Sequence, residues 1–254
     1  MNSLLTLLSC SAQPNQAWLW QTEQAHEIKF GTVGHFNHSD PLNQITAKAW
    51  HNQATADGRV KTQWLSDQAW LDSWQAGDQR QVTLHQDFIR PDGVTYWPQQ
   101  AQIWLADRSS LAWVLAAAKE RQQAKQAGLE VAPMIALLKH DPLLPVQLKP
   151  ARFILDLAGS ALGAVPILED WGVVNRVAHP DGLPGCYEGE LADLLADLLN
   201  HLPHHLSNHS PENQPAWYLL GQLKETDQQA CLAQTDHLFI RHYLTHRLPA
   251  QATQ

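Results

Sequence analysis

The chain has 254 residues, of which 44% are hydrophobic and 17% charged, a composition typical of folded globular proteins that excludes a disordered chain. The formal net charge is −8 and the basic residues are scattered singly, so duplex DNA is not an expected partner. The longest apolar run, residues 153–168, contains Asp156 and Pro166 and is too short to span a bilayer, so no membrane is expected as a partner. Three widely spaced cysteines form no zinc-binding pattern, and we expect them as thiols in the cytoplasm.

The first hundred residues contain the clearest strand pattern. Apolar and polar residues alternate close to period two from Gln81, and Pro91-Asp92-Gly93 supplies turn chemistry before an extended run resumes. Residues 81–97 therefore predict a β-hairpin. A helix is predicted over residues 107–126, where Asp107 or Ser109 can cap the first turn and Gly128 suits the position after the last one.

The second half of the chain reads as helical. Residues 190–202 place leucines at i, i+3, i+4, i+7, i+8 and i+11 on one face, which predicts an amphipathic helix. A last helix is predicted from Thr226, which forms a capping box with Gln229, to about Arg247.

Composition divides the chain into two parts. Nine of the eleven tryptophans fall in the first 113 residues, and eight of the fourteen histidines fall after residue 178. Residues 140–150 contain three prolines and are predicted to be a linker, because proline cannot continue a helix or a central strand. We expect an α+β fold: a Trp-rich, β-containing part with a closing helix over residues 1–130, and a mainly helical, Leu- and His-rich part over 151–254. A core shared by both parts remains an alternative.

A hexapeptide near the C-terminus carries a possible catalytic pattern. Arg241-His242-Tyr243-Leu244-Thr245-His246 separates an arginine from a histidine by four residues. This pattern resembles the ribonuclease motif of HEPN domains, a helical family. The resemblance implies that a dimer brings two such helices into one cleft, where Arg241 and His246 position a ribose 2′-OH and stabilise the scissile phosphate. A solvated helix end is the competing interpretation, and the same spacing recurs at Arg80 and His85 in the predicted hairpin.

A histidine cluster is the candidate metal site. His201 and His205 are four residues apart, so on an intact helix both imidazoles could bind one metal ion, with His209 as a further ligand. Pro203 lies between them and favours a break in the helix. Histidines on the surface near a helix end are the alternative. An acidic stripe at residues 190, 193 and 197 could hold Mg²⁺, or simply be the solvated face of a leucine helix.

No nucleotide motif is found, since residues 159–163 lack both the Lys-Ser/Thr ending of a phosphate loop and the third glycine of a dinucleotide fingerprint. We therefore expect no cofactor. We expect several tryptophans in the core and about two or three at a surface that meets a partner, with a core that contains all of them as the alternative. The leading hypothesis is a non-catalytic interaction or assembly subunit of a bacterial cytosolic complex, docking another protein through exposed aromatics and amphipathic helices. The alternatives are a HEPN-like ribonuclease of a defence system, with RNA as partner, and a metal-dependent hydrolase using the cluster from His201 to His209.

Overall fold

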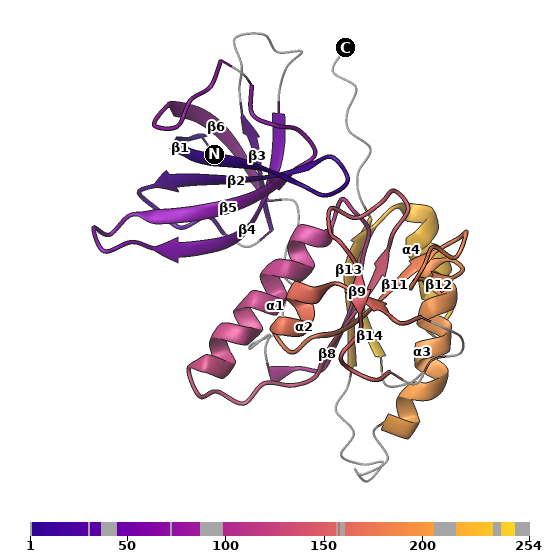
Figure 1. The fold of residues 1–254 in the computed structure, drawn as a ribbon. Coiled ribbons are helices and arrows are strands. Elements are labelled where there is room, and N and C mark those ends of the chain that lie inside the picture. The colour runs from indigo at the N-terminus through magenta and orange to yellow at the C-terminus, as the bar shows by residue number, and fades with distance from the viewer. Residues whose placement is uncertain are drawn as a thin grey trace. The chain divides into compact units, whose positions relative to one another are not determined.

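The computed structural model describes residues 2–29, 31–36, 45–71, 73–86, 99–155, 157, 161–205, 217–235 and 240–246. The chain divides into two compact units, residues 1–92 and 93–254. Figure 1 shows that the first unit is built of strands and the second of a sheet with helices on both faces.

The first unit is a closed antiparallel barrel with the strand order β1-β2-β5-β4-β3-β6. The strands are β1 (Asn2–Gln13), β2 (Ala17–Gln24), β3 (Thr32–Phe36), β4 (Ile45–Ala54), β5 (Val60–Ser66) and β6 (Gln79–Gln86). The pairing of β1 with β6, from Asn2 opposite Thr83 to Thr6 opposite Gln79, closes the barrel. Closure satisfies the backbone hydrogen-bonding groups that an open edge strand would leave unpaired.

The barrel is filled by aromatic side chains. Trp20, Phe36 and Trp64 are fully buried, and Trp74 is 3% exposed. Their rings meet edge to face, with centroids 4.9 Å apart for Trp20 and Phe36 and 5.5 Å apart for Phe36 and Trp64. A Cβ on Gly34 would lie 2.9 Å from the Trp64 ring, so a side chain at this strand position would force the ring to shift. These tryptophans therefore form a core and not a docking surface.

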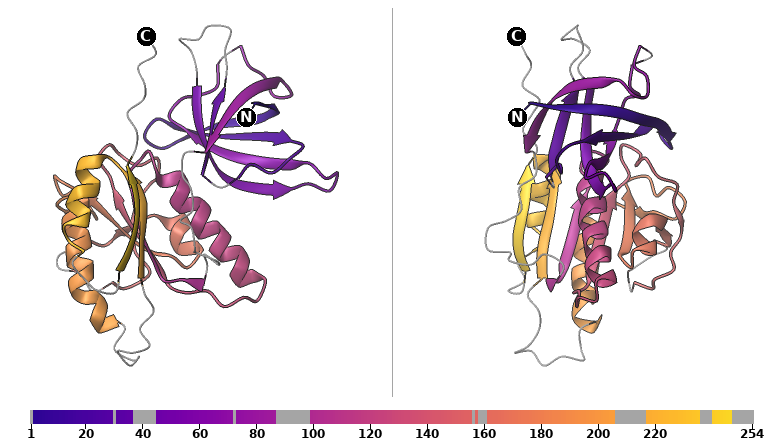
Figure 2. Two further views of the ribbon diagram at one scale, coloured as in Figure 1. Left: turned by 180° about the vertical axis from the view of Figure 1, so that it is seen from behind. Right: turned by 90° about the vertical axis from the view of Figure 1, so that its left-hand side faces the viewer.

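The second unit is a six-stranded parallel sheet with the order β12-β11-β8-β7-β13-β14. The strands are β7 (Gln102–Ala106), β8 (Met134–Lys139), β11 (Val174–His179), β12 (Tyr187–Glu188), β13 (Trp217–Leu223) and β14 (Ile240–His246). A separate two-stranded sheet pairs β9 (Lys149–Pro150) with β10 (Gly163–Ala164). The helices α1 (Leu111–Gln126) and α2 (Pro166–Asp170) cover one face, and α3 (Leu191–His205) and α4 (Glu225–Leu232) cover the other (Figure 2).

One core cluster of the second unit lies under α3, on the face of the sheet opposite α1 (Figure 2). The leucine face of this helix is 0–7% exposed and packs against the strands through residues such as Ile103, Leu137 and Leu219. The helix predicted over residues 190–202 is confirmed and extends to His205. The helix predicted over 107–126 is observed as α1, beginning at Leu111.

The expectation of a mainly helical second part is wrong, because six parallel strands form its centre. Strands such as β7 and β8 are buried on both faces, so their sequences are continuous apolar runs without the alternation that marks a half-buried strand. The predicted last helix is also wrong: α4 ends at Leu232, and residues 240–246 form β14.

Two further predicted segments are placed by the structure. The first strand of the hairpin predicted at 81–97 corresponds to β6, which pairs with β1 and β3, and residues 87–98 lie outside the described residues. Residues 140–150 lie in the second unit, between β8 and the end of β9. Within the described part of the chain, none of the helices has the length and apolar character needed to cross a membrane.

Candidate functional site

The parallel sheet reverses its strand order at β7. From β7 the chain crosses through α1 to β8 on one side, and it later returns through α3 to β13 on the other side. Open parallel sheets bind ligands at the carboxyl ends of the strands beside such a crossover, because the connections diverge there and leave a crevice. Gly221 of β13 maintains the close packing at this point, since a Cβ there would lie 2.3 Å from the carbonyl oxygen of Leu105 in β7.

The turn from β7 into α1 is organised by Asp107. Its Oδ1 accepts hydrogen bonds from the backbone nitrogens of Ser109 and Ser110, at 2.8 and 3.0 Å. The hydroxyls of the same two serines donate to it at 2.6 and 3.1 Å. Asp107 is 5% exposed, and its own backbone nitrogen donates to Ser110 Oγ at 3.0 Å. The carboxylate thus satisfies backbone donors that the first turn of a helix cannot satisfy internally.

Two buried histidines follow at the carboxyl ends of β8 and β11. His140 and His179 are 7% and 8% exposed, and their ring centroids are 6.2 Å apart. Nδ1 of each ring accepts a backbone hydrogen bond, from Leu144 at 3.0 Å and from Asp181 at 3.1 Å, so the proton of each neutral ring is assigned to Nε2. Burial lowers the pKa of His140, and the neighbouring His179 lowers it further.

Another polar group at this edge is an ion-paired lysine. Lys139 Nζ, at the end of β8, lies 2.9 Å from Glu190 Oε2 and 3.1 Å from Asp227 Oδ1. Burial by itself lowers the pKa of Lys139, but its hydrogen bonds to the two carboxylates outweigh burial and the pKa is raised. Burial also raises the pKa of the nearby Cys231 thiol to about 12, which makes this cysteine a packed and unreactive residue. The lysine therefore joins the sheet to α3 and α4.

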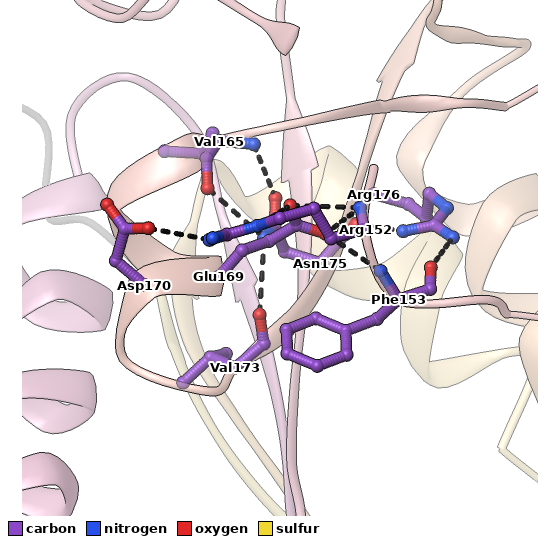
Figure 3. A network of polar contacts seen from close by, with 8 residues as sticks. All are labelled: Arg152, Phe153, Val165, Glu169, Asp170, Val173, Asn175 and Arg176. Atoms are coloured by element: carbon purple, nitrogen blue, oxygen red, sulfur yellow. Dashed lines mark hydrogen bonds and ion pairs between the residues drawn. The ribbon is translucent and has the colours of Figure 1, made fainter. Parts of the chain in front are cut away.

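A third polar network lies at the amino end of β11 and supports a loop (Figure 3). Glu169 of α2 is 5% exposed, and its carboxylate accepts backbone hydrogen bonds from Arg152 and Phe153 at 2.9 and 3.3 Å. Asn175 bonds the backbone nitrogen of Val165 at 2.7 Å, and the Arg176 guanidinium donates to the carbonyl oxygen of Phe153 at 2.6 Å. Because its contacts are mostly to backbone groups, we interpret this network as structural.

The barrel contains a polar network between its strands at one end. Thr22 accepts a hydrogen bond from Trp64 Nε1 at 2.9 Å, and Thr62 bonds Asn52 Oδ1 at 2.6 Å. Gln24 connects the two threonines, and Asn52 donates to the carbonyl oxygen of Ile28 at 2.6 Å. Each of these buried polar groups finds a partner, so this end of the barrel needs no ligand for its stability.

A cavity of about 550 Å³ opens where β1 begins and β2 and β6 end. Its walls include Gln24, His26, Glu27, Lys29 and His85. Both an acidic and a basic side chain line the cavity, so its charge does not select a cationic or an anionic ligand.

A β-bulge in β4 places one tryptophan outside the aromatic core. The pairing of β4 with β5 shifts register between Ala49 and His51, and Trp50 is the inserted residue. Trp50 is half-buried, and its ring centroid lies 5.6 Å from that of His51 at an interplanar angle of 33°. Lys48, two residues earlier, is 9% exposed. Bulges redirect side chains and are common beside functional sites, so this is the strongest candidate site of the barrel.

The residues predicted for ribonuclease chemistry were expected on a helix, and the structure places them on a strand. Arg241 and His246 lie in β14, an edge strand parallel to β13, and not on a helix. The HEPN-like prediction depends on a helical domain, so the parallel sheet overturns it. The side chains of both residues lie outside the described part of the chain.

The histidine cluster is only partly described. His201 lies on α3, where its Nδ1 is 2.8 Å from the carbonyl oxygen of Asp197 and 3.2 Å from that residue's Oδ1. His205 ends α3, and His209 lies outside the described residues. Among the described residues, no group of three or more His, Cys, Asp or Glu side chains could hold a metal ion.

No protein-family model and no curated protein matches the chain. Solved structures do match: the reductase GcoB from Amycolatopsis has 13% identity over 97% of this chain and 70% of its own, with a TM-score of 0.57. Ferredoxin-NADP+ reductase from Plasmodium falciparum, solved with 2′P-AMP, has 7% identity over 96% of both chains and a TM-score of 0.57. A ferredoxin NADP+ reductase from Neisseria gonorrhoeae, with bound FAD and NADP, has 9% identity over 96% of this chain and 98% of its own, with a TM-score of 0.53.

These similarities concern the fold. They overturn the predicted assembly subunit and metal-dependent hydrolase, because the three structural neighbours are named as reductases, one of them with bound FAD and NADP. Sequence reasoning did not single out Trp50, Lys48 or His140 as site residues, and it interpreted His179 as part of a loop with turn chemistry. The bulge at Trp50 leaves no signal in a single sequence. The proximity of the two histidines could have been predicted only if the apolar runs before them had been assigned to adjacent parallel strands.

Proposed function

We propose that this chain is a flavin-dependent electron-transfer oxidoreductase in which the barrel holds the flavin. The observation that carries the proposal is the combination, in one chain, of a closed barrel of order β1-β2-β5-β4-β3-β6 with a parallel sheet that reverses at β7. Reductases share this combination over 96–97% of this chain, and one of them is named with bound FAD. When bound, a flavin supplies one- or two-electron transfer.

The residues of the β4 bulge fit a flavin. A flavin has a flat aromatic ring system and at least one phosphate, so it needs a stacking surface and a positive charge. Trp50 is half-buried and outside the barrel core, and Lys48 brings an ammonium group to the same strand. His51 adds ring nitrogens that can donate or accept a hydrogen bond. We assign the stacking role to Trp50 and the phosphate contact to Lys48.

The test is a titration of the full chain with FAD and with FMN, followed by quenching of flavin fluorescence. We expect saturable binding of at least one flavin and, because base–aromatic stacking contributes about 1–3 kcal/mol, about tenfold weaker binding by Trp50→Leu. Trp18→Leu is the matched control, since Trp18 is also half-buried but packs against the barrel core. It should bind flavin as the unchanged chain does.

Two results would contradict the proposal at different levels. If neither flavin binds the folded chain, the function is wrong. If Trp50→Leu and Trp18→Leu bind flavin equally well, the barrel holds it elsewhere and only the assignment of Trp50 is wrong. Another protein as redox partner and a cytoplasmic location are further parts of the proposal, and the free thiols of Cys10, Cys186 and Cys231 agree with the latter.

A further inference from the structure

Parallel sheets that bind dinucleotides share a physical solution for the pyrophosphate. The phosphates lie at the N-terminus of the helix that follows the first strand, because backbone N–H groups there lack partners and the helix dipole favours negative charge. Glycines in the preceding turn allow the backbone to approach the phosphate oxygens closely. In this chain the corresponding turn runs from Asp107 to Ser110, between β7 and α1, and contains no glycine.

The donors of this turn are already bound to a carboxylate. Asp107 Oδ1 accepts the backbone N–H groups of Ser109 and Ser110 and the hydroxyl groups of both serines. Asp107 is 5% exposed, so its carboxylate is buried within the turn. A pyrophosphate placed here would compete with Asp107 for the same donors and would face a like charge at short range.

The turn is also hydrogen-bonded to the segment that follows β8. Arg108 donates from Nη1 to the carbonyl oxygen of Leu143, after β8, at 2.7 Å. Leu111 donates its backbone N–H to the carbonyl oxygen of Asp107 at 3.0 Å. Opening the turn for a ligand would therefore break contacts on both sides of the carboxylate.

From these contacts we infer that Asp107 takes the place of a ligand phosphate and excludes the pyrophosphate of a nicotinamide dinucleotide from the N-terminus of α1. The strand order is that of a sheet that could bind a dinucleotide. The residues of the turn between β7 and α1, however, do not fit the pyrophosphate of that ligand. Asp107 is thus a specificity-determining residue of the second unit. This inference rests on the contacts of the turn and not on flavin binding, so each proposal can fail alone.

The experiment maps the turn directly. The isotope-labelled full chain is titrated with inorganic pyrophosphate and, separately, with NADPH, and the amide resonances of Ser109, Ser110 and Leu111 are followed by NMR. We expect no saturable shift of these amides in the unchanged chain. In Asp107→Gly, which frees the donors and adds the missing glycine, we expect saturable shifts and an affinity for pyrophosphate at least about tenfold higher.

Asp107→Asn is the matched control, because its amide oxygen keeps the cap while the charge is lost. It should bind pyrophosphate more weakly than Asp107→Gly, because the donors stay occupied and only the like charge is removed. A gain equal to that of Asp107→Gly would contradict occupation of the donors. Saturable shifts of the three amides in the unchanged chain would overturn the inference, as would a folded Asp107→Gly chain without any gain. If Asp107→Gly does not fold, the titration of the unchanged chain decides. Flavin binding, measured on the same samples, reports on the proposed function separately.

Discussion

The barrel and the parallel sheet have cores of different kinds. In the barrel, buried aromatic rings contact one another, as Trp20 contacts Phe36, and Trp64 also donates its Nε1 hydrogen to Thr22. In the sheet unit, the leucines of α3 pack on the strands, and Trp104 and Trp113 donate their Nε1 hydrogens to the side-chain oxygens of Gln102 and Gln222. The barrel is closed, so its candidate site lies on a bulged strand. The sheet is open at its carboxyl edge, where the polar groups described above bond one another or the backbone. The two proposals above therefore place a ligand at the bulge in β4 and exclude one from the N-terminus of α1.

The aromatic core should make the barrel sensitive to the loss of one ring. We expect Trp64→Ala to lower the free energy of unfolding by about 3–5 kcal/mol, because a fully buried indole leaves a large cavity and Thr22 loses a hydrogen-bond partner. Urea unfolding followed by circular dichroism measures the change. Trp18→Ala, at a half-buried position, should cost clearly less. Equal losses would show that the rings do not form one core.

A glycine in each unit tests how rigid its surroundings are. Gly221→Ala should destabilise the chain by about 3 kcal/mol, at the upper end for overpacking, because the new Cβ would lie 2.3 Å from the backbone oxygen of Leu105. Gly34→Ala in the barrel should cost less, about 1–2 kcal/mol, because the neighbour at 2.9 Å is the side chain of Trp64. Thermal unfolding of both variants gives the order, and the reverse order would show that the barrel is the more rigid unit.

The two carboxylates that pair with Lys139 should contribute unequally to the free energy of unfolding. Asp227→Asn should cost about 1–2 kcal/mol, because the carboxylate is 18% exposed and Lys139 is 14% exposed. Glu190→Gln is the control and should cost at most about 0.5 kcal/mol, since Glu190 is 52% exposed. Because the pKa of Lys139 is raised, the stabilisation is complete below the ordinary value of 10.5 and is lost as pH rises through the folded pKa. Urea titrations at neutral and at high pH test both points.

The smallest expected effect is the pH response of His140. Burial lowers its pKa in the folded chain, so the unfolded chain binds a proton first as pH falls below 6.5, and stability decreases in that range. His140→Gln keeps an acceptor for the backbone nitrogen of Leu144 but cannot titrate. The variant should therefore lose less stability than the unchanged chain between pH 7.5 and pH 5, in buffers of about equal ionic strength. An identical loss in both would show that other groups control the acid response.

Among the strands, the sequence was more informative about those of the barrel than about those of the parallel sheet. The alternation that begins at Gln81 predicted a strand, and β6 occupies that position with Val82 inside the barrel and Gln81 exposed, while Arg80 lies over the ring of the core residue Trp74. Residues 134–139 are equally apolar at nearly every position, and nothing in such a run distinguishes a helix from a strand. Predicting the site at the crossover would have required these strand assignments. Asp107 was predicted as a helix cap, but its position beside the crossover could not be predicted while β7 and β13 were unassigned.

By itself the sequence determined the local elements whose pattern arises within the element: the helices α1 and α3 and the strand β6. It offered Asp107 or Ser109 as the cap of α1. In the structure Ser110 directly precedes the helix, and Asp107 accepts the backbone hydrogen bonds of Ser109 and Ser110. Only the tertiary structure decided that the buried apolar runs are parallel strands, that residues 240–246 form an edge strand, and that Trp50 leaves the core at a bulge. The physical reason is the range of the interactions. Capping and helical amphipathicity act over a few residues, whereas strand pairing, register and burial on both faces of a sheet depend on residues far apart in the chain.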